Sequence, residues 1–140
     1  VLADAPAVVV AGTSVSVEFV GGNLRNELRT HDSYLRVERL VGARGGALAE
    51  ARAGGDTWQL VAEDGDVETR LHATRSDGYV RVGVRWDVPP TTPPGEYRVT
   101  HAGAWRARGL LKTSVRPYSG TSRVFSVRAP PRGGPPRPAR

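Results

Sequence analysis

The chain of 140 residues has the length of one domain with a single core. Its 17 glycines and 11 prolines favour a fold with many turns over one with long helices. The formal net charge is +6, but the arginines are dispersed along the chain without a basic run, which argues against a nucleic-acid partner. The absence of cysteine excludes a disulfide scaffold and a zinc site with cysteine ligands.

Two features at the beginning of the chain bear on its processing. The apolar run at residues 7–12 is too short to span a membrane or to form a signal-peptide core, and no positively charged leader precedes it. Because the chain starts at Val1 rather than at a methionine, we expect a mature fragment or a domain cut from a longer protein.

In the first half of the chain, alternation of apolar and polar residues with period two predicts four strands. A segment rich in glycine and alanine at residues 43–56 separates the second from the third and is predicted to be a loop. The predicted strands are residues 15–19 with Val15, Val17 and Phe19 on one face, 33–40 with Leu35 and Val37 on one face, 57–62, and 69–74.

The clearest alternation in the chain runs through residues 79–88, and the proline-rich segment 89–95 ends it because proline cannot continue a ladder. Residues 129–140 have no apolar anchor, so we expect a disordered tail rich in proline, arginine and glycine. The strands predicted in this half are 79–88 with Val80, Val82, Val84 and Trp86 on one face, 96–103 with Tyr97, Val99 and His101, and 122–128 with Phe125 and Val127.

Short strands separated by turn signals predict an all-β fold, an antiparallel β-sandwich over residues 1–128, followed by the tail 129–140. The Pro-Gly turn before Tyr97 admits two interpretations. In one, the hydroxyl of Tyr97 bonds back to nearby backbone, as in a tyrosine corner. In the other, Tyr97 is a core residue that follows a plain turn.

Acidic residues are concentrated at residues 63–68 of an otherwise basic chain. Asp64 and Asp66 flank Gly65, which permits a tight turn with positive φ, and Thr69 adds a hydroxyl or carbonyl oxygen. Such oxygens suit hard cations such as Ca²⁺, and a cation would relieve the repulsion between the two carboxylates. The alternative is a solvated turn in which the aspartates bond to their own backbone. The spacing alone leaves both interpretations open.

The chain shows no self-contained catalytic apparatus. His31, His72 and His101 have no zinc-site spacing, and no G-x-S-x-G motif occurs, so we predict no catalytic residue in this chain. His101 shares a predicted strand face with Tyr97 and Val99, which favours a hydrogen-bonded histidine at the edge of the core.

Two segments that connect predicted strands have residue types that suggest a role. Residues 104–118 mix two leucines, Trp105 and Tyr118 with basic side chains. This segment either contacts a membrane or partner surface, or is a long hairpin loop whose apolar residues fold back on the sandwich. Residues 23–30 are predicted to be a fixed connection whose asparagines bond local backbone.

Several segments together resemble the C-terminal domain of neutral/alkaline non-lysosomal ceramidases. The resemblance covers about Val15 to Val127, and it is carried by an Asn-x-Arg-Asn motif that starts at Asn23, followed by Asp-x-Asp-x-Glu-Thr-Arg from Asp64. The matching segments are 15–40, 58–70, 84–103 and 118–127, in the order found in that family.

The resemblance implies an immunoglobulin-like sandwich that packs on and stabilises a larger, zinc-dependent catalytic domain of a secreted enzyme. That enzyme hydrolyses the N-acyl bond of ceramide to sphingosine and a fatty acid. The large domain is absent from this chain, so the Zn²⁺ ligands and catalytic residues cannot be carried over, and the chain alone is not expected to be active. The resemblance also implies Ca²⁺ or Mg²⁺ at Asp64, Asp66 and Thr69, at the junction of the two domains, with low affinity in the isolated chain.

A second function class stays open at this point. An independent secreted β-sandwich that serves as a binding or adhesion module would show the same strand pattern. The two hypotheses differ in whether an amidase domain precedes Val1.

Overall fold

The computed structural model describes residues 1–21, 34–42, 56–76, 79–108 and 113–131, and the regular structure in this part of the chain is β-strand. Within these residues there is no helix of a length and apolarity that would cross a membrane. The strands are β1 Val8–Val10, β2 Ser14–Gly21, β3 Leu35–Gly42, β4 Thr57–Glu63, β5 Thr69–Ser76, β6 Tyr79–Asp87, β7 Gly95–Arg108, β8 Thr113–Thr121 and β9 Phe125–Arg128.

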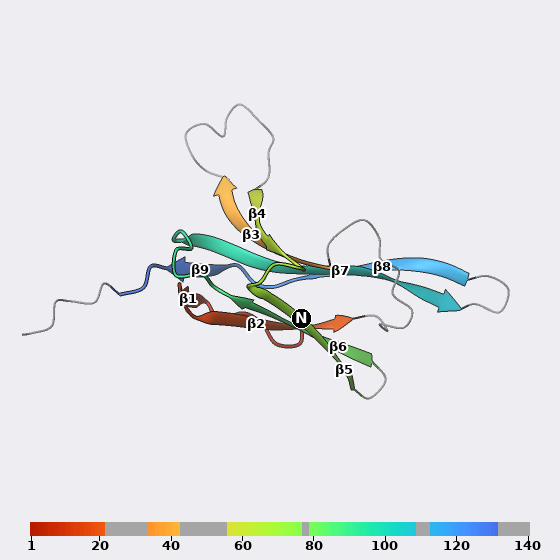
Figure 1. Ribbon diagram of the computed structural model, residues 1–140. Coiled ribbons are helices and arrows are strands. Elements are labelled where there is room, and N and C mark those ends of the chain that lie inside the picture. The colour runs from red at the N-terminus through yellow and green to blue at the C-terminus, as the bar shows by residue number, and fades with distance from the viewer. Residues whose placement is uncertain (22–33, 43–55, 77–78, 109–112, 132–140) are drawn as a thin grey trace, which may run out of the picture.

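The strands form two layers (Figure 1). The smaller sheet is antiparallel and has the order β2-β6-β5. The larger sheet has the order β1-β9-β7-β3-β4, and β8 pairs with the part of β7 that β9 leaves open. β1 and β9 run parallel, whereas the other paired strands are antiparallel. The predicted all-β, immunoglobulin-like sandwich is confirmed.

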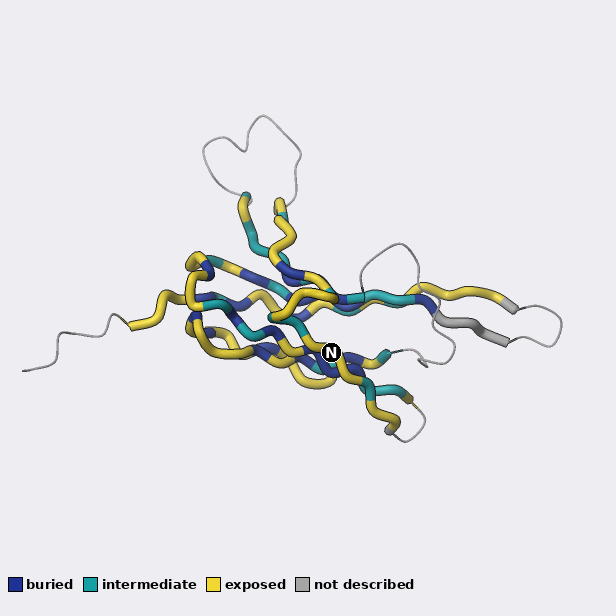
Figure 2. The backbone as a smooth tube through the Cα atoms, viewed as in Figure 1, coloured by how far each residue is buried: buried dark blue, intermediate teal, exposed yellow. Residues whose placement is uncertain are grey.

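The core lies between the two sheets and is built from the strand faces that the alternation predicts (Figure 2). Trp86 on the smaller sheet contacts Tyr97 on the larger one, with ring centroids 5.6 Å apart. Tyr97 in turn stacks on Phe125 at 6.3 Å. These three rings are each at most 1% exposed, so they join the two layers at the centre of the core.

Tyr97 settles the choice between the two interpretations of the Pro-Gly turn. Its hydroxyl donates to the carbonyl oxygen of Pro93 at 2.7 Å, four residues earlier in the chain. Burial raises the pKa of Tyr97, against the opposing charge of Arg39. The tyrosine-corner interpretation is therefore confirmed.

The structure adds two strands that the sequence pattern does not predict, β1 and β8. The prediction of a loop across 104–118 is wrong for its described residues, because β7 and β8 pair from Thr100–Thr121 to Arg108–Thr113. Tyr118 lies across the strand from Gly103, and its ring occupies the space above this glycine. The predictions for 23–30, for most of the loop 43–56 and for tail residues 132–140 lie outside the described residues.

Candidate functional site

The acidic segment lies where the chain crosses from one sheet to the other. In the described part of the chain, β4 is an edge strand of the larger sheet, β5 is an edge strand of the smaller one, and residues 64–68 join them directly. The N–H of Asp66 donates to the carbonyl of Glu63 at 3.2 Å, and Gly65 has a φ of 104°. The predicted tight turn with positive φ at Gly65 is therefore confirmed, in a conformation that glycine adopts most easily.

Hydrogen bonds to Glu63 hold Asp66 and Thr69 together. Oδ2 of Asp66 accepts the N–H of Glu63 at 2.8 Å. The Thr69 hydroxyl lies 2.7 Å from the carbonyl oxygen of Glu63 and 3.1 Å from that of Asp66, and it donates to these acceptors. These local hydrogen bonds between side chains and backbone order the turn.

Asp64 differs from Asp66 because the turn does not use its carboxylate. Its backbone N–H donates to the carbonyl of Leu35 on β3 at 3.2 Å, which ties the turn to the larger sheet. Its Oδ1 is buried and accepts no hydrogen bond from the described residues. A buried carboxylate oxygen without a donor is costly, so a cation or an external donor would stabilise it.

The described side chains do not complete a metal site by themselves. Among them, no group of three or more histidine, cysteine, aspartate or glutamate residues is placed to hold a metal ion. Asp64, Asp66 and Thr69 thus belong to one turn, but Asp66 and Thr69 already bond to backbone there. Because Ca²⁺ takes six to eight oxygen ligands, these three residues would leave part of its shell to other groups.

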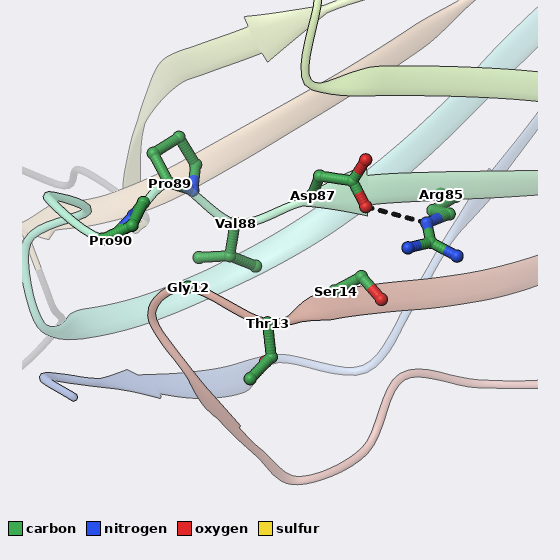
Figure 3. A pocket seen from close by; sticks show the side chains of 8 residues that line it. All are labelled: Gly12, Thr13, Ser14, Arg85, Asp87, Val88, Pro89 and Pro90. Carbon is green, nitrogen blue, oxygen red and sulfur yellow. Dashed lines mark hydrogen bonds and ion pairs between the residues drawn. The ribbon is translucent and has the colours of Figure 1, made fainter. Parts of the chain in front are cut away.

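A groove of about 520 Å³ lies beside this turn, at the end of β6 (Figure 3). The N–H of Asp87 donates to the carbonyl of Glu68 at 2.8 Å, which joins the groove to the acidic turn. Nε of Arg85 lies 2.7 Å from Asp87, and Arg70 lies 3.5 Å from it. The hydrogen bond from Arg85 lowers the pKa of Asp87, although burial opposes the shift. The groove is lined by Gly12, Thr13, Ser14, Arg85, Asp87, Val88, Pro89 and Pro90.

The sequence pattern does not predict this groove, although one of its contacts has a local signal. Arg85 and Asp87 are two residues apart on a predicted strand, so they share a face and can pair. The contact between Asp87 and Glu68 joins β6 to the acidic turn, which is distant in sequence, and has no such local signal. Arg85 and Asp87 neutralise each other's charge within the groove, which fits a structural role of this pair better than a catalytic one.

The described histidines do not converge. His101 is 2% exposed, and its Nδ1 lies 2.7 Å from the carbonyl oxygen of Tyr34, to which it donates because a carbonyl only accepts. Its ring lies 5.6 Å from that of Phe19 and 5.5 Å from that of Tyr118. His72 is exposed and lies over Gly83, whose missing side chain leaves room for the ring. The predicted hydrogen bond of His101 is confirmed, whereas His31 lies outside the described residues.

Like Arg70, Arg81 and Arg98 form ion pairs across neighbouring strands. Arg81 lies 2.8 Å from Glu18 on the smaller sheet, and Arg98 lies 2.7 Å from Glu38 on the larger one. The guanidinium of Arg98 also stacks on Trp58, 4.1 Å from the ring centroid. These arginines therefore contact neighbouring side chains on the two sheets.

Comparison with known proteins assigns the chain to a family. Residues 1–127 match the family model of the neutral/alkaline non-lysosomal ceramidase C-terminal domain. The chain is 34% identical over 115 residues to neutral ceramidase B of Dictyostelium discoideum, covering 81% of this chain and 14% of that protein. It is 34% identical over 128 residues to the neutral ceramidase of Mycobacterium tuberculosis, covering 91% of this chain and 18% of that protein.

The fold comparison agrees with the sequence comparison. The crystal structure of neutral ceramidase from Pseudomonas aeruginosa superposes with a TM-score of 0.71 and 27% identity, over 92% of this chain and 19% of that chain. A structure described as ceramidase complexed with C2 gives a TM-score of 0.72, also with 27% identity, over 92% of this chain and 18% of that one. The chain thus spans less than a fifth of the length of these relatives. It belongs to the C-terminal domain family of the neutral/alkaline non-lysosomal ceramidases.

Proposed function

We propose that this chain is the accessory C-terminal domain of a neutral ceramidase, which hydrolyses the N-acyl bond of ceramide to sphingosine and a fatty acid. In this proposal the domain packs on a zinc-dependent catalytic domain of a secreted enzyme and stabilises it. The supporting observation is the coverage: the match takes in 92% of this chain but 19% of the ceramidase from Pseudomonas aeruginosa.

A structural role also agrees with the polar contacts of the domain. Asp66 and Thr69 bond to backbone, Asp87 pairs with Arg85, and His101 is buried and bonded to backbone. Groups engaged in this way hold the fold and have little freedom to bind a substrate or move a proton.

Ceramide hydrolysis tests this function directly. The intact polypeptide that carries this domain is expected to hydrolyse ceramide, and the 140-residue chain alone is not. A truncated polypeptide without this domain is expected to lose activity at a lower temperature. Turnover of ceramide by the isolated chain, abolished when zinc is chelated, would show that the chain is itself an enzyme.

We further propose a Ca²⁺ or Mg²⁺ ion at the acidic turn, held between the two domains. The residues fit such an ion in part: Oδ1 of Asp64 is buried without a donor, and the turn holds Asp66 and Thr69 nearby. The bound ion would supply positive charge to the carboxylates. Because these residues offer too few ligands, water or the catalytic domain would complete the shell, and the isolated chain would bind weakly.

Calorimetry and thermal unfolding test the cation. We expect no submicromolar Ca²⁺ binding by the isolated chain. In the intact polypeptide, Ca²⁺ at about 100 times its Kd would stabilise the fold by roughly 2.7 kcal/mol. Asp64→Asn is expected to remove most of this gain, whereas Asp56→Asn, an exposed change outside the turn, is expected to keep it. Tight binding by the isolated chain, or an equal gain in the Asp64→Asn variant, would contradict the proposal.

Contact with a lipid surface is a second proposed role, assigned to the β7–β8 hairpin. The described part of this hairpin extends beyond the sandwich (Figure 1), and Val115 on β8 is 51% exposed. Tyr118 instead packs beside His101, 5.5 Å between ring centroids, so it serves the fold. Val115→Asp is expected to reduce co-sedimentation of the intact polypeptide with phosphatidylcholine vesicles. Unchanged co-sedimentation would remove the hairpin from this role.

A further inference from the structure

The turn between β4 and β5 contains an Asp-Gly pair, Asp64-Gly65, within the described part of the chain. In such a pair, the glycine nitrogen is separated from the carboxyl carbon of the aspartate by a single ring closure. This proximity gives attack within the molecule a large advantage over attack by a separate nucleophile. Because glycine has no side chain, its nitrogen is also less shielded than that of other residues. Whether the pair reacts then depends on how the fold holds the two groups.

The backbone nitrogen of Gly65 is accessible. Gly65 is exposed, and within the described residues its N–H donates no hydrogen bond. The N–H groups of Asp64 and Asp66, on either side of it, both donate to carbonyl oxygens. A Cβ built at Gly65 would meet no atom within 4 Å, so the space beside this residue is open. The fold therefore leaves the attacking nitrogen open to solvent and free of hydrogen bonds.

The carboxyl group of Asp64 is not held by a hydrogen bond either. Its Oδ1 is buried without a donor, and its carboxylate accepts no hydrogen bond from the described residues. Rotation of this side chain towards Gly65 therefore breaks no hydrogen bond. Asp66 is the contrast in the same turn, because its Oδ2 accepts the N–H of Glu63 at 2.8 Å. The residue that follows Asp66 is Val67, whose branched side chain crowds the nitrogen that would have to attack.

We propose that Asp64-Gly65 is a site of spontaneous modification, at which aspartate converts to isoaspartate. The nitrogen of Gly65 forms a bond to Cγ of Asp64 in its carboxylic-acid form, the Cγ–OH bond breaks, and the amide proton and the hydroxyl leave as water. Water then opens the five-membered imide. Attack at Cγ restores aspartate, whereas attack at the main-chain carbonyl carbon of Asp64 gives isoaspartate. One water is released and one is consumed, so the reaction needs no other reactant, and the inference does not depend on the proposed function.

Isoaspartate would change the turn, because it lengthens the main chain by one carbon atom. That atom enters between Glu63 and Asp66, which are joined by two hydrogen bonds. The N–H of Asp66 donates to the carbonyl of Glu63 at 3.2 Å, and the N–H of Glu63 donates to Oδ2 of Asp66 at 2.8 Å. Both bonds span the lengthened segment, so they cannot keep their geometry. Since this turn connects the larger sheet to the smaller one, the modification would loosen the crossing between them.

Val67→Gly supplies a matched control, because it gives Asp66 a following glycine as well. Val67 is 90% exposed, so the change removes no core contact. The 140-residue chain with this change is incubated in neutral, metal-free buffer and digested with trypsin, which places both aspartates on the peptide 53–70. Electron-transfer fragmentation distinguishes isoaspartate from aspartate at each position. We expect isoaspartate to form at least about ten-fold faster at position 64 than at position 66, where one hydrogen bond must first break.

Incubation of the same variant in urea completes the test, because the two rates should converge when the turn is unfolded. Equal rates in the folded chain would overturn the inference, since the fold would then not select Asp64. Absence of isoaspartate at position 64 during a time in which the unfolded chain forms it would show that the fold protects the pair. Asp64→Glu closes a six-membered ring less readily, and an undiminished signal in this variant would show that the product does not come from this carboxyl group.

Discussion

The hydroxyl of Tyr97 offers the sharpest test of how the sandwich is held together. Tyr97→Phe removes the 2.7 Å hydrogen bond to the carbonyl of Pro93 and keeps the ring against Trp86 and Phe125. Pro93 is exposed, so water can bond to its freed carbonyl. We therefore expect a loss of about 1 kcal/mol in the free energy of unfolding, the net value of one neutral hydrogen bond.

This loss converts into a measurable shift. For a chain of this size, about 1 kcal/mol lowers Tm by roughly 3–5 °C. Urea unfolding of the 140-residue chain, followed by circular dichroism, gives the free energy directly. Tyr97→Ala is the comparison, because it also removes the buried ring and should cost about 3–5 kcal/mol.

The pH dependence gives the same residue a second, independent readout. Burial raises the pKa of Tyr97 above its ordinary value of 10.0, so the folded state holds this proton more tightly than the unfolded state. The resulting stability is fully present below pH 10.0 and is lost as the pH rises through the higher folded-state pKa. Tyr97→Phe should therefore show a smaller fall in stability in this alkaline range than the parent chain.

Two results would refute this account of the corner. If Tyr97→Phe is as stable as the parent chain, the hydrogen bond to Pro93 contributes nothing. If both chains lose stability equally above pH 10.0, burial does not perturb Tyr97.

The remaining predictions concern Asp4 in the N-terminal segment and two glycines. Asp4→Ala removes the acceptor of two backbone N–H groups and should cost about 1–2 kcal/mol in urea unfolding. Burial raises the pKa of Asp4, but the hydrogen bonds that its carboxylate accepts from Arg123 and Ala5 have the larger combined effect. The net result is a pKa below the ordinary value of 3.8. The stability from Asp4 is thus present above pH 3.8 and is lost as the pH falls through the folded-state pKa, a loss that Asp4→Ala should not show. Gly120→Ala should cost about 1–3 kcal/mol, because a Cβ there would lie 2.7 Å from the buried ring of Phe19. Gly83→Ala is the control and should cost less, since the three atoms nearest to its Cβ all belong to the exposed, movable imidazole of His72; equal losses for the two glycines would contradict this reasoning.

The sequence predicts those parts of the fold whose cause is local. The alternation in β2 and β6 specifies which residues are buried, because neighbouring side chains of a strand point to opposite faces. β8 escapes prediction because it contains Pro117 and Gly120, residues that disfavour strands. β8 forms because β7 pairs with it along the whole length of β8, which is a non-local cause.

The same division holds for the candidate site. The positive φ at Gly65 and the bonds of Asp66 and Thr69 to Glu63 arise within one turn, so their residue types indicate them. The hydrogen bond from the N–H of Asp64 to Leu35 joins the turn to β3, which is far away in sequence, so it needs the folded chain. The exposure of Leu71 likewise depends on a non-local cause, because β5 ends the smaller sheet in the described part of the chain.

The central claim is that this domain supports a catalytic domain elsewhere in a ceramidase polypeptide. The most direct measurement is the temperature at which the intact polypeptide loses ceramide hydrolysis, compared between the parent and Tyr97→Phe. This residue lies in the core of the β-sandwich and is 0% exposed. The claim predicts that activity is lost at a lower temperature in the variant, with hydrolysis at low temperature unchanged. Equal inactivation temperatures, in a variant whose C-terminal domain unfolds earlier, would show that the catalytic domain does not depend on this sandwich.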